Sequence, residues 1–486
     1  MTRPSAFQLR GAGWQPARRL STAATLLLGA LLPLACAQPY DVVILNGRLM
    51  DPASRLDAPR NLGIRAGKIA AISASPLAGR VAIDAGSLVV APGFIDIHQH
   101  GQDAENYRLK ALDGVTTALE MEVGAIPVES WNAARAGKSL INFGASAGHI
   151  PALMQAMRDT GGLLPRDAAA TRVPTDQEHR QSLDLIRRSL DEGGLGIGMG
   201  IAYVKSTRAQ ILDVFRLAAE RQVPVYVHMR ASGPVEPGAI DSLQEVLADA
   251  AATGASLHVV HVTSTCLAET PVCLAMIEGA RKHGMDVTTE AYPYTAGMTD
   301  LSSAIFDPGW QQRLGNITYS DLQWALTGER LTAASFARYR KLGGMVAIHG
   351  IPEEVVREAM ADPQVMIASD GILANGKGHP RAAGSYARVL GRYVREEHAL
   401  SLMDALRKMT VMPADRIGLP DKGRLSVGAD ADITVFDPAR VIDRATFDRP
   451  AQASQGIVYV LVNGTVVVKD GVVQENVAPG RPVTRR

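Results

Sequence analysis

The sequence predicts an α/β fold: a (β/α)8 TIM-like barrel with a small composite β-sandwich domain built from both chain ends. The barrel is predicted because eight short apolar runs alternate with helix-like segments between residues 91 and 415. These runs cover residues 94–98, 114–123, 140–148, 195–201, 223–228, 256–261, 286–291 and 365–369. Helical patterns such as 206–221 and 237–253 separate them, as the βα alternation of a parallel sheet requires.

The β-sandwich is predicted from the two flanks of the barrel. Residues 38–90 contain short strand patterns at 41–47 and 67–72. Residues 416–486 repeat this style at 431–436 and 457–464 before a C-terminal tail. We expect the two flanks to join in one small domain beside the barrel.

One connection of the barrel is too long to be a simple loop. It covers about residues 295–364 and contains Trp310, Trp324 and Phe336. We expect this insertion to hold helices and to form a lid over the pocket.

The first 37 residues have the pattern of a secretory signal peptide. Arg18 and Arg19 precede an apolar run at 23–32, and the small-residue stretch 35–37 follows. The run is short for a membrane-spanning helix, so we expect export, to the periplasm. A lipid anchor on Cys36 is the alternative, although Pro33 stands where such sites favour an aliphatic residue.

Two further cysteines, Cys266 and Cys273, remain after the signal segment, with six residues between them. In an oxidising compartment they can pair, and two buried thiols are the alternative.

Composition excludes some partners. The 486 residues have a formal net charge of +1 and 5% aromatic content, so neither nucleic acid nor a membrane surface is indicated beyond the export segment. A small-molecule substrate is the expected partner, and a homo-oligomer is left open.

Residues that bind metals stand at the ends of four predicted strands. His98 and His100 are one residue apart, so both point to the same side of the first strand. His228, His261 and Asp370 end three other strands. Imidazole and carboxylate are the ligands of catalytic zinc, and the C-terminal ends of barrel strands meet at one face. We therefore predict one tightly bound Zn²⁺ and room for a second divalent ion.

Seven motifs spread over the chain support a family resemblance. They lie at residues 90–100, 114–117, 228–230, 292–297, 379–381, 389–393 and 428–433. With them, the chain after residue 40 resembles the amidohydrolase superfamily, specifically the D-aminoacylase (N-acyl-D-amino-acid deacylase) branch, which includes N-acyl-D-glutamate deacylases. The resemblance implies a metal-dependent amidohydrolase that cleaves linear N-acyl amides of D-amino acids.

The resemblance also implies roles for the acidic residues. Asp370 corresponds to the aspartate that serves as general base and acid, and a helix N-cap is its structural alternative. Relatives have a metal-binding cysteine on the second strand, which this chain lacks. We predict that Glu122 replaces it as a ligand, with Glu120 as the second choice. A salt bridge to a basic residue is the alternative for Glu122.

An N-acyl amino acid has a free carboxylate, so the pocket should offer donors to it. Relatives usually have a lysine where this chain has Thr263. The remaining candidates for substrate binding are Tyr203, Lys205, Arg230, Tyr292 and Arg381. Arg230 and Arg381 have structural ion pairs as their alternative, and surplus cations favour an acidic side chain such as D-glutamate.

Two other functions compete with the deacylase. A cyclic amidase of the hydantoinase or dihydroorotase kind shares the barrel and the histidine pair, and it commonly uses a carboxylated lysine on the fourth strand. That strand has no lysine here, although Lys205 follows closely. The other alternative is a non-catalytic metal-binding or ligand-binding protein, against which Asp370 argues because binding alone does not require it.

Overall fold

The computed structural model describes residues 40–485, so the predicted signal segment and Cys36 lie outside the described residues. In this part of the chain no helix is long and apolar enough to cross a membrane.

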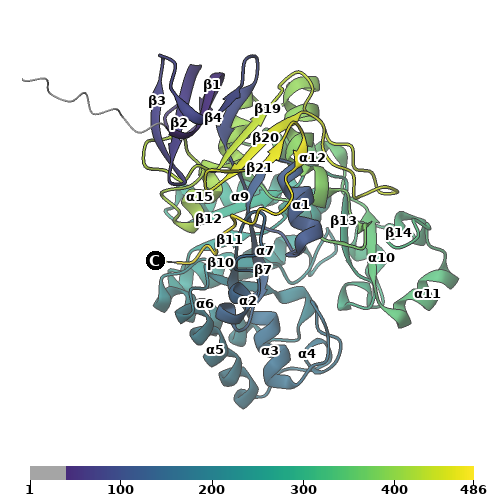
Figure 1. The fold of residues 1–486 in the computed structure, drawn as a ribbon. Helices are drawn as coiled ribbons and strands as arrows, with labels where there is room; N and C mark the ends of the chain where they lie inside the picture. The colour runs from purple at the N-terminus through teal and green to yellow at the C-terminus, as the bar shows by residue number, and fades with distance from the viewer. Residues whose placement is uncertain (1–39, 486) are drawn as a thin grey trace, which may run out of the picture. The chain divides into compact units, whose positions relative to one another are not determined.

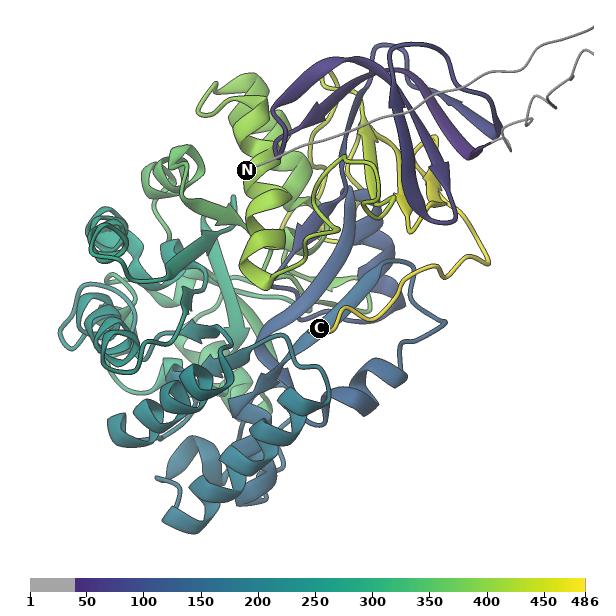
Figure 2. The same cartoon turned by 90° about the vertical axis from the view of Figure 1, so that its left-hand side faces the viewer.

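Eight parallel strands form the barrel, in the order β16-β12-β11-β10-β9-β8-β7-β6 (Figures 1 and 2). All eight predicted strands are confirmed. They are β6 (Phe94–Asp96), β7 (Val115–Ala125), β8 (Asn142–Gly148), β9 (Ile197–Gly200), β10 (Val225–His228), β11 (Leu257–Val259), β12 (Val287–Ala291) and β16 (Val365–Ile367). Most of their residues are buried on both faces, which is why the strands are nearly continuous apolar runs.

Helices connect these strands, and the two helices predicted at 206–221 and 237–253 are confirmed. The connecting helices include α1 (Ala104–Leu112), α3 (His149–Met157), α5 (Asp176–Asp191), α6 (Arg208–Arg221), α7 (Ala239–Thr253), α8 (Val262–Cys266), α9 (Thr270–Lys282), α13 (Arg381–Arg388) and α14 (Leu402–Met409). Thr175 and Thr207 begin α5 and α6 with capping boxes, which satisfy the free N–H groups of the first turn.

Short contacts join the first and last strands of the barrel just beyond their C-terminal ends. The Asp370 N–H donates to the His98 carbonyl at 2.7 Å, and the His100 N–H donates to Gly371 at 3.0 Å. Behind them the Ser369 hydroxyl donates to Asp96 at 2.5 Å. Closure therefore fixes the histidine pair next to Asp370.

The two flanks of the chain join, as the sequence predicts, and their strands form one nine-stranded sheet. Its strands are β1 (Tyr40–Asp51), β2 (Leu56–Arg65), β3 (Lys68–Ser73), β4 (Gly79–Asp84), β5 (Val89–Pro92), β19 (Ile433–Phe436), β20 (Ile457–Val462), β21 (Thr465–Lys469) and β22 (Val472–Val473). β5 and β19 join the two halves, with Val90 opposite Val435. Because β5 continues through Gly93 into β6, the sheet is attached directly to the first barrel strand.

The long insertion contains a small sheet as well as the expected helices. Strands β13 (Ala296–Asp300), β14 (Leu322–Trp324) and β15 (Met345–His349) pair antiparallel, and α11 (Ala333–Leu342) lies between the last two in sequence. Trp310 and Trp324 belong to the apolar core of this insertion. The strands are short and lack regular alternation, so the sequence pattern predicted only the helices.

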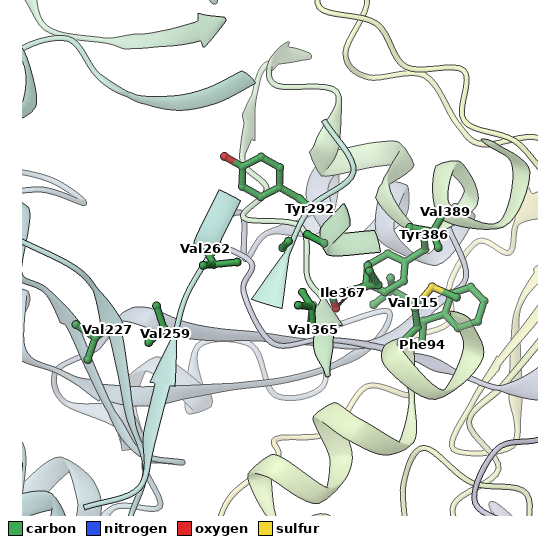
Figure 3. Packing of buried hydrophobic residues seen from close by; sticks show 14 of the residues in the cluster. Phe94, Val115, Val227, Val259, Val262, Tyr292, Val365, Ile367, Tyr386 and Val389 are labelled. Carbon is green, nitrogen blue, oxygen red and sulfur yellow. Dashed lines mark hydrogen bonds between the residues drawn. The ribbon is translucent and has the colours of Figure 1, made fainter. Parts of the chain in front are cut away.

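The main core lies between the barrel strands and the helices that follow them (Figure 3). Phe94 of β6 stacks on Tyr386 of α13 with ring centroids 5.6 Å apart. Val115 and Ile367 are fully buried in the same cluster. The strand ends therefore rest on a packed core, which favours a site of fixed geometry.

Candidate metal centre

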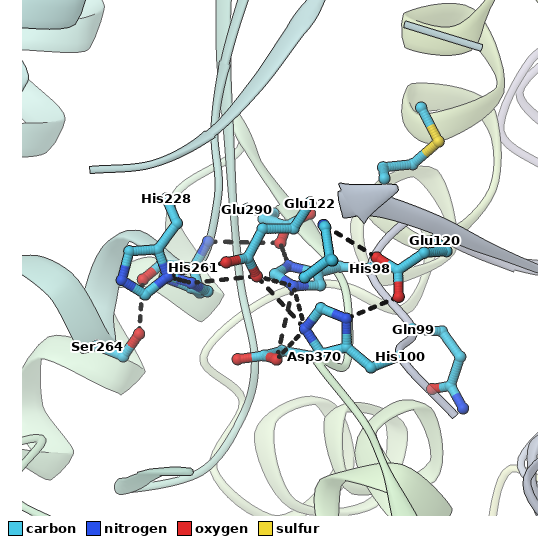
Figure 4. A network of polar contacts seen from close by, with 12 residues as sticks. His98, Gln99, His100, Glu120, Glu122, His228, His261, Ser264, Glu290 and Asp370 are labelled. Atoms are coloured by element: carbon cyan, nitrogen blue, oxygen red, sulfur yellow. Dashed lines mark hydrogen bonds and ion pairs between the residues drawn. The ribbon is translucent and has the colours of Figure 1, made fainter. Parts of the chain in front are cut away.

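The predicted metal ligands come together at the C-terminal ends of the barrel strands (Figure 4). His98 and His100 follow β6, His228 ends β10, His261 follows β11 and Asp370 follows β16. All five side chains are at least nine-tenths buried. His261 and Asp370 also have left-handed φ angles of 33° and 52°, a conformation that costs energy for a non-glycine residue.

Glu122 lies at the centre of these residues. Its Oε2 is 2.6 Å from Nε2 of His98, and its Oε1 is 2.9 Å from Nδ1 of His228. The same Oε2 is 3.4 Å from His100 and 3.7 Å from His261. One carboxylate thus contacts imidazoles from both sides of the centre.

Two groups of ligand atoms share this carboxylate. His98, His100, Glu122 and Asp370 form one group, and Glu122, His228 and His261 form the other, with the atoms of each group within 4.8 Å of one another. Because Glu122 belongs to both groups, the residues present would suffice to hold two cations.

Two further carboxylates support the histidines from behind. Glu120 lies 2.8 Å from Nδ1 of His100, and Glu290 lies 2.5 Å from Nδ1 of His98. A carboxylate on the far ring nitrogen fixes the tautomer and orientation of a metal-binding histidine. The geometry therefore places Glu120 behind a ligand and Glu122 among the ligands.

The buried charges shift each other's protonation. Burial alone would raise the pKa of Glu122, but His228 and His98 outweigh it and hold that pKa well below its usual range. Burial also opposes the charge on His98, yet Glu290 and Asp370 hold its pKa well above the ordinary value. The carboxylates thus favour positive charge in the site, as the raised pKa values of His98 and His100 indicate.

Asp370 faces the centre with one oxygen and Arg381 with the other. Its Oδ1 is 3.2 Å from Nε2 of His100, and its Oδ2 is 2.9 Å from Nη2 of Arg381. Arg381 and His98 hold the pKa of Asp370 below its usual value although burial opposes them. The alternative of a helix N-cap is wrong, because the next helix, α13, begins only at Arg381.

Two of the five predicted substrate-binding residues, Tyr203 and Tyr292, line the cavity above the centre. The guanidinium of Arg381 lies 4.5 Å from the centre of the Tyr292 ring, and its Nε and Nη1 have no partner in the described residues.

The other two candidates lie elsewhere. Arg230 forms a two-pronged ion pair with Glu245, at 2.9 and 2.7 Å, which is the structural alternative considered for it. Lys205 lines a neighbouring depression together with Arg230. Neither is among the residues that line the cavity above the centre.

Sequence reasoning missed Glu290 and Thr265. Glu290 also contacts Nε2 of His258 at 3.2 Å, so His258 supports His98 through this carboxylate. The Thr265 hydroxyl lies 3.1 Å from Nδ1 of His261. An acidic residue near the end of a predicted strand was the available signal for Glu290.

Comparison with known proteins places this geometry in a family. The family model described as "Amidohydrolase family" matches residues 151–468, more than half of the chain. The chain belongs to the amidohydrolase family. Within the amidohydrolases, it is 33% identical to an N-acyl-D-glutamate deacylase of Alcaligenes xylosoxydans xylosoxydans, over 88% of this chain and 94% of that protein. A D-aminoacylase of the same organism is 30% identical, over 89% and 95%.

A solved amidohydrolase structure has the same fold. It is the N-acyl-D-glutamate deacylase of Bordetella bronchiseptica, complexed with zinc and a phosphonate inhibitor that mimics the tetrahedral intermediate. It superposes with a TM-score of 0.79 at 30% identity, covering 92% of this chain and all of that one.

Proposed function

We propose that this protein is a metal-dependent hydrolase that cleaves the N-acyl amide bond of N-acyl-D-amino acids. The observation that carries the proposal is a buried carboxylate, Glu122, shared by two groups of metal-type ligands beside Asp370. The similarity to deacylases over nearly the whole chain supports it.

The residues present fit a zinc ion. Glu122, His228 and His261 would hold the first ion, because Nδ1 of His228 lies 2.9 Å from Oε1 of Glu122 and 3.0 Å from Nε2 of His261. His98, His100, Glu122 and Asp370 would hold a second divalent ion. When bound, zinc polarises the scissile carbonyl and makes a water nucleophilic near neutral pH.

The side chains of the chain supply the proton transfers and the orientation. Asp370 accepts a proton from the attacking water and passes it to the leaving nitrogen. Arg381 keeps Asp370 ionised before the reaction and aims its free oxygen at the centre. We propose that Arg381 and Tyr292 also face the carboxylate of the substrate, because both present polar atoms without partners beside Asp370.

The competing functions find less support. A cyclic amidase of the hydantoinase or dihydroorotase kind commonly uses a carboxylated lysine on the fourth strand, but β9 contains no lysine and Lys205 lines another depression. A non-catalytic metal-binding or ligand-binding protein would not require an ionised Asp370 paired with Arg381. We propose a preference for the D-enantiomer because the similar proteins are deacylases of N-acyl-D-amino acids. Three contacts, to the carbonyl, the carboxylate and the side chain of the substrate, would distinguish the two enantiomers.

We also propose that the protein is exported to the periplasm, with a lipid anchor on Cys36 as the alternative. The pattern of residues 1–37 supports export. The disulfide between Cys266 and Cys273 also supports it, since disulfides persist in oxidising compartments.

Metal content and enantiomer preference test the proposal. Purified protein should contain at least one zinc per chain and hydrolyse acetylated D-amino acids faster than their L-enantiomers. Glu122→Ala should lower the zinc content, whereas the control His283→Ala, an exposed residue at the end of α9, should not. Full zinc content in Glu122→Ala contradicts the ligand assignment, and absence of D-hydrolysis contradicts the deacylase function.

A further inference from the structure

The wall of the cavity above the metal centre is largely aliphatic. Ten of its lining residues are apolar: Val123, Leu163, Leu164, Leu267, Met298, Ile305, Leu314, Met345, Ile348 and Ile351. The polar lining atoms belong mostly to the centre itself or to neutral hydroxyl groups such as those of Tyr203 and Ser264. A small molecule in this cavity would therefore contact hydrocarbon away from the reacting bond.

Most of this wall comes from segments outside the barrel strands. Met298, Met345 and Ile348 belong to the small sheet of the insertion. Leu163 and Leu164 belong to the connection after α3. The barrel thus supplies the chemistry, and the added segments supply the apolar surface.

The basic residues near the mouth are separated from this cavity. Arg230 lines the neighbouring depression, where Glu245 neutralises it. Ser232, Ile305 and Leu314 line both spaces, so they form the partition between them. Apart from the histidines of the centre, no basic side chain of the described residues lines the cavity. Because the proposed function assigns Arg381 to the α-carboxylate, an acidic substrate side chain would lose its water there without gaining an ion pair.

Leu163 stands out at the rim. It is 39% exposed, one of the few large apolar side chains of the described residues that solvent reaches to this degree. It also lines the cavity. An exposed apolar residue at the mouth of an apolar cavity gains if an aliphatic group covers it.

From these observations we infer that the preferred substrates have an aliphatic chain that packs against this wall, rather than an acidic side chain. The inference rests on the proposed deacylase function and narrows its substrate class. The chain can be the side chain of the amino acid or the acyl group, since both extend from the scissile amide. Each buried methylene should raise kcat/KM roughly three- to fourfold until the wall is covered.

Two substrate series test the inference and separate the two sources. The first compares N-acetyl derivatives of D-alanine, D-norvaline, D-leucine and D-glutamate. The second compares N-acetyl-, N-butyryl- and N-hexanoyl-D-alanine. We expect kcat/KM to rise at least tenfold along one series and to be lower for D-glutamate than for D-leucine. A higher value for D-glutamate, or two flat series, overturns the inference. No hydrolysis of any substrate contradicts the proposed function instead.

A rim variant tests the wall itself. Leu163→Arg should lower kcat/KM for the longest favourable substrate at least fivefold. The matched control is Leu326→Arg, because Leu326 is 62% exposed and does not line the cavity. If Leu163→Arg preserves the full dependence on chain length, the assignment of this wall is wrong.

Discussion

At the scale of single residues, the position of Glu122 follows from strand geometry. Alternate residues of a strand face the same side, so Glu120 and Glu122 both enter the mouth of the barrel. The one nearer the strand end lies among four imidazoles, and the other lies behind His100. A metal between these groups would replace the protons that His98 and His100 hold in its absence.

Asp370→Asn is expected to lower kcat by roughly 10²- to 10⁴-fold, because an amide cannot accept a proton from the attacking water. The zinc bound by Glu122, His228 and His261 should remain, since Asp370 belongs only to the other ligand group. Steady-state kinetics, metal analysis and circular dichroism check these outcomes. Asp184→Asn, at an exposed position of α5, is the control. Turnover near the wild-type rate would remove Asp370 from the mechanism.

Sequence parity and strand ends could predict most of the centre, because both depend only on local geometry. The roles of Arg230 and Arg381 were not predictable in this way. Neither arginine lies in a segment whose hydrophobic pattern indicates where its side chain points. The partner of Arg230 is set by tertiary packing, because α7 places Glu245 against it. Glu290 needed the knowledge that β12 lies two strands from the histidine pair across the closed barrel.

At the scale of elements, the short segment after β11 connects the wall of the cavity to the ligand group of Glu122, His228 and His261. Thr265 in α8 contacts His261. Leu267, which follows α8 with a φ of 50°, lies in the cavity wall. The disulfide ties Cys266 in this segment to Cys273 in the first turns of α9. The pairing was left open by spacing alone, because it depends on how sharply the chain turns between the two helices.

Replacing both Cys266 and Cys273 by alanine should lower the free energy of unfolding by roughly 2 kcal/mol, the value for so short a loop. It should also weaken zinc retention, since Thr265 would no longer be held on His261. Urea unfolding and competition with a chelator measure the two effects. Thr265→Val should reproduce the zinc effect without the full stability loss, and Thr265→Ser should restore it. If chelator resistance is unchanged in all three variants, the disulfide contributes to stability and not to zinc retention.

Helix α7 contains an acidic pair that makes stability depend on pH. Burial and the neighbouring Glu245 raise the pKa of Asp249 from 3.8 to about 6, although Arg208 and Arg230 oppose them. A carboxyl whose pKa is higher in the folded state costs stability as pH rises from about 4 to about 6. Asp249→Asn should therefore raise Tm above pH 6 and leave it unchanged below pH 4. Thermal melts at pH 4 and 7.5 measure the difference. An equal change in Tm at both pH values would contradict the shift.

At the scale of the whole molecule, eight strand patterns and two β-rich flanks were enough to predict the barrel and the composite sheet. Those patterns depend only on nearby residues and recur along the chain, so an error of a few residues in one strand does not change the predicted fold. The small sheet of the insertion was not predicted, because its strands of three to five residues are stabilised by the apolar cluster around Trp310 rather than by their own pattern. That same insertion provides much of the cavity wall.

A buried ion pair lies where the first and last strands of the barrel meet. Nζ of Lys110 in α1 lies 2.8 Å from Asp96, and both side chains are fully buried. Asp96 also accepts hydrogen bonds from the Ser369 hydroxyl and from the His98 N–H, so one carboxylate holds the ends of β6 and β16 together.

Lys110→Met removes the only cation that pairs with Asp96 among the described residues and leaves a buried charge without compensation. The free energy of unfolding should fall by about 3–5 kcal/mol. Zinc content should fall with it, because His98 and Asp370 are attached to the two strands that Asp96 joins. The double variant Lys110→Met with Asp96→Asn should recover part of the stability, since no unpaired charge remains. Urea unfolding followed by circular dichroism gives all three values. A loss below about 1 kcal/mol in the single variant would mean that backbone pairing alone closes the barrel, and the strand ends would then hold the metal ligands without help from this ion pair.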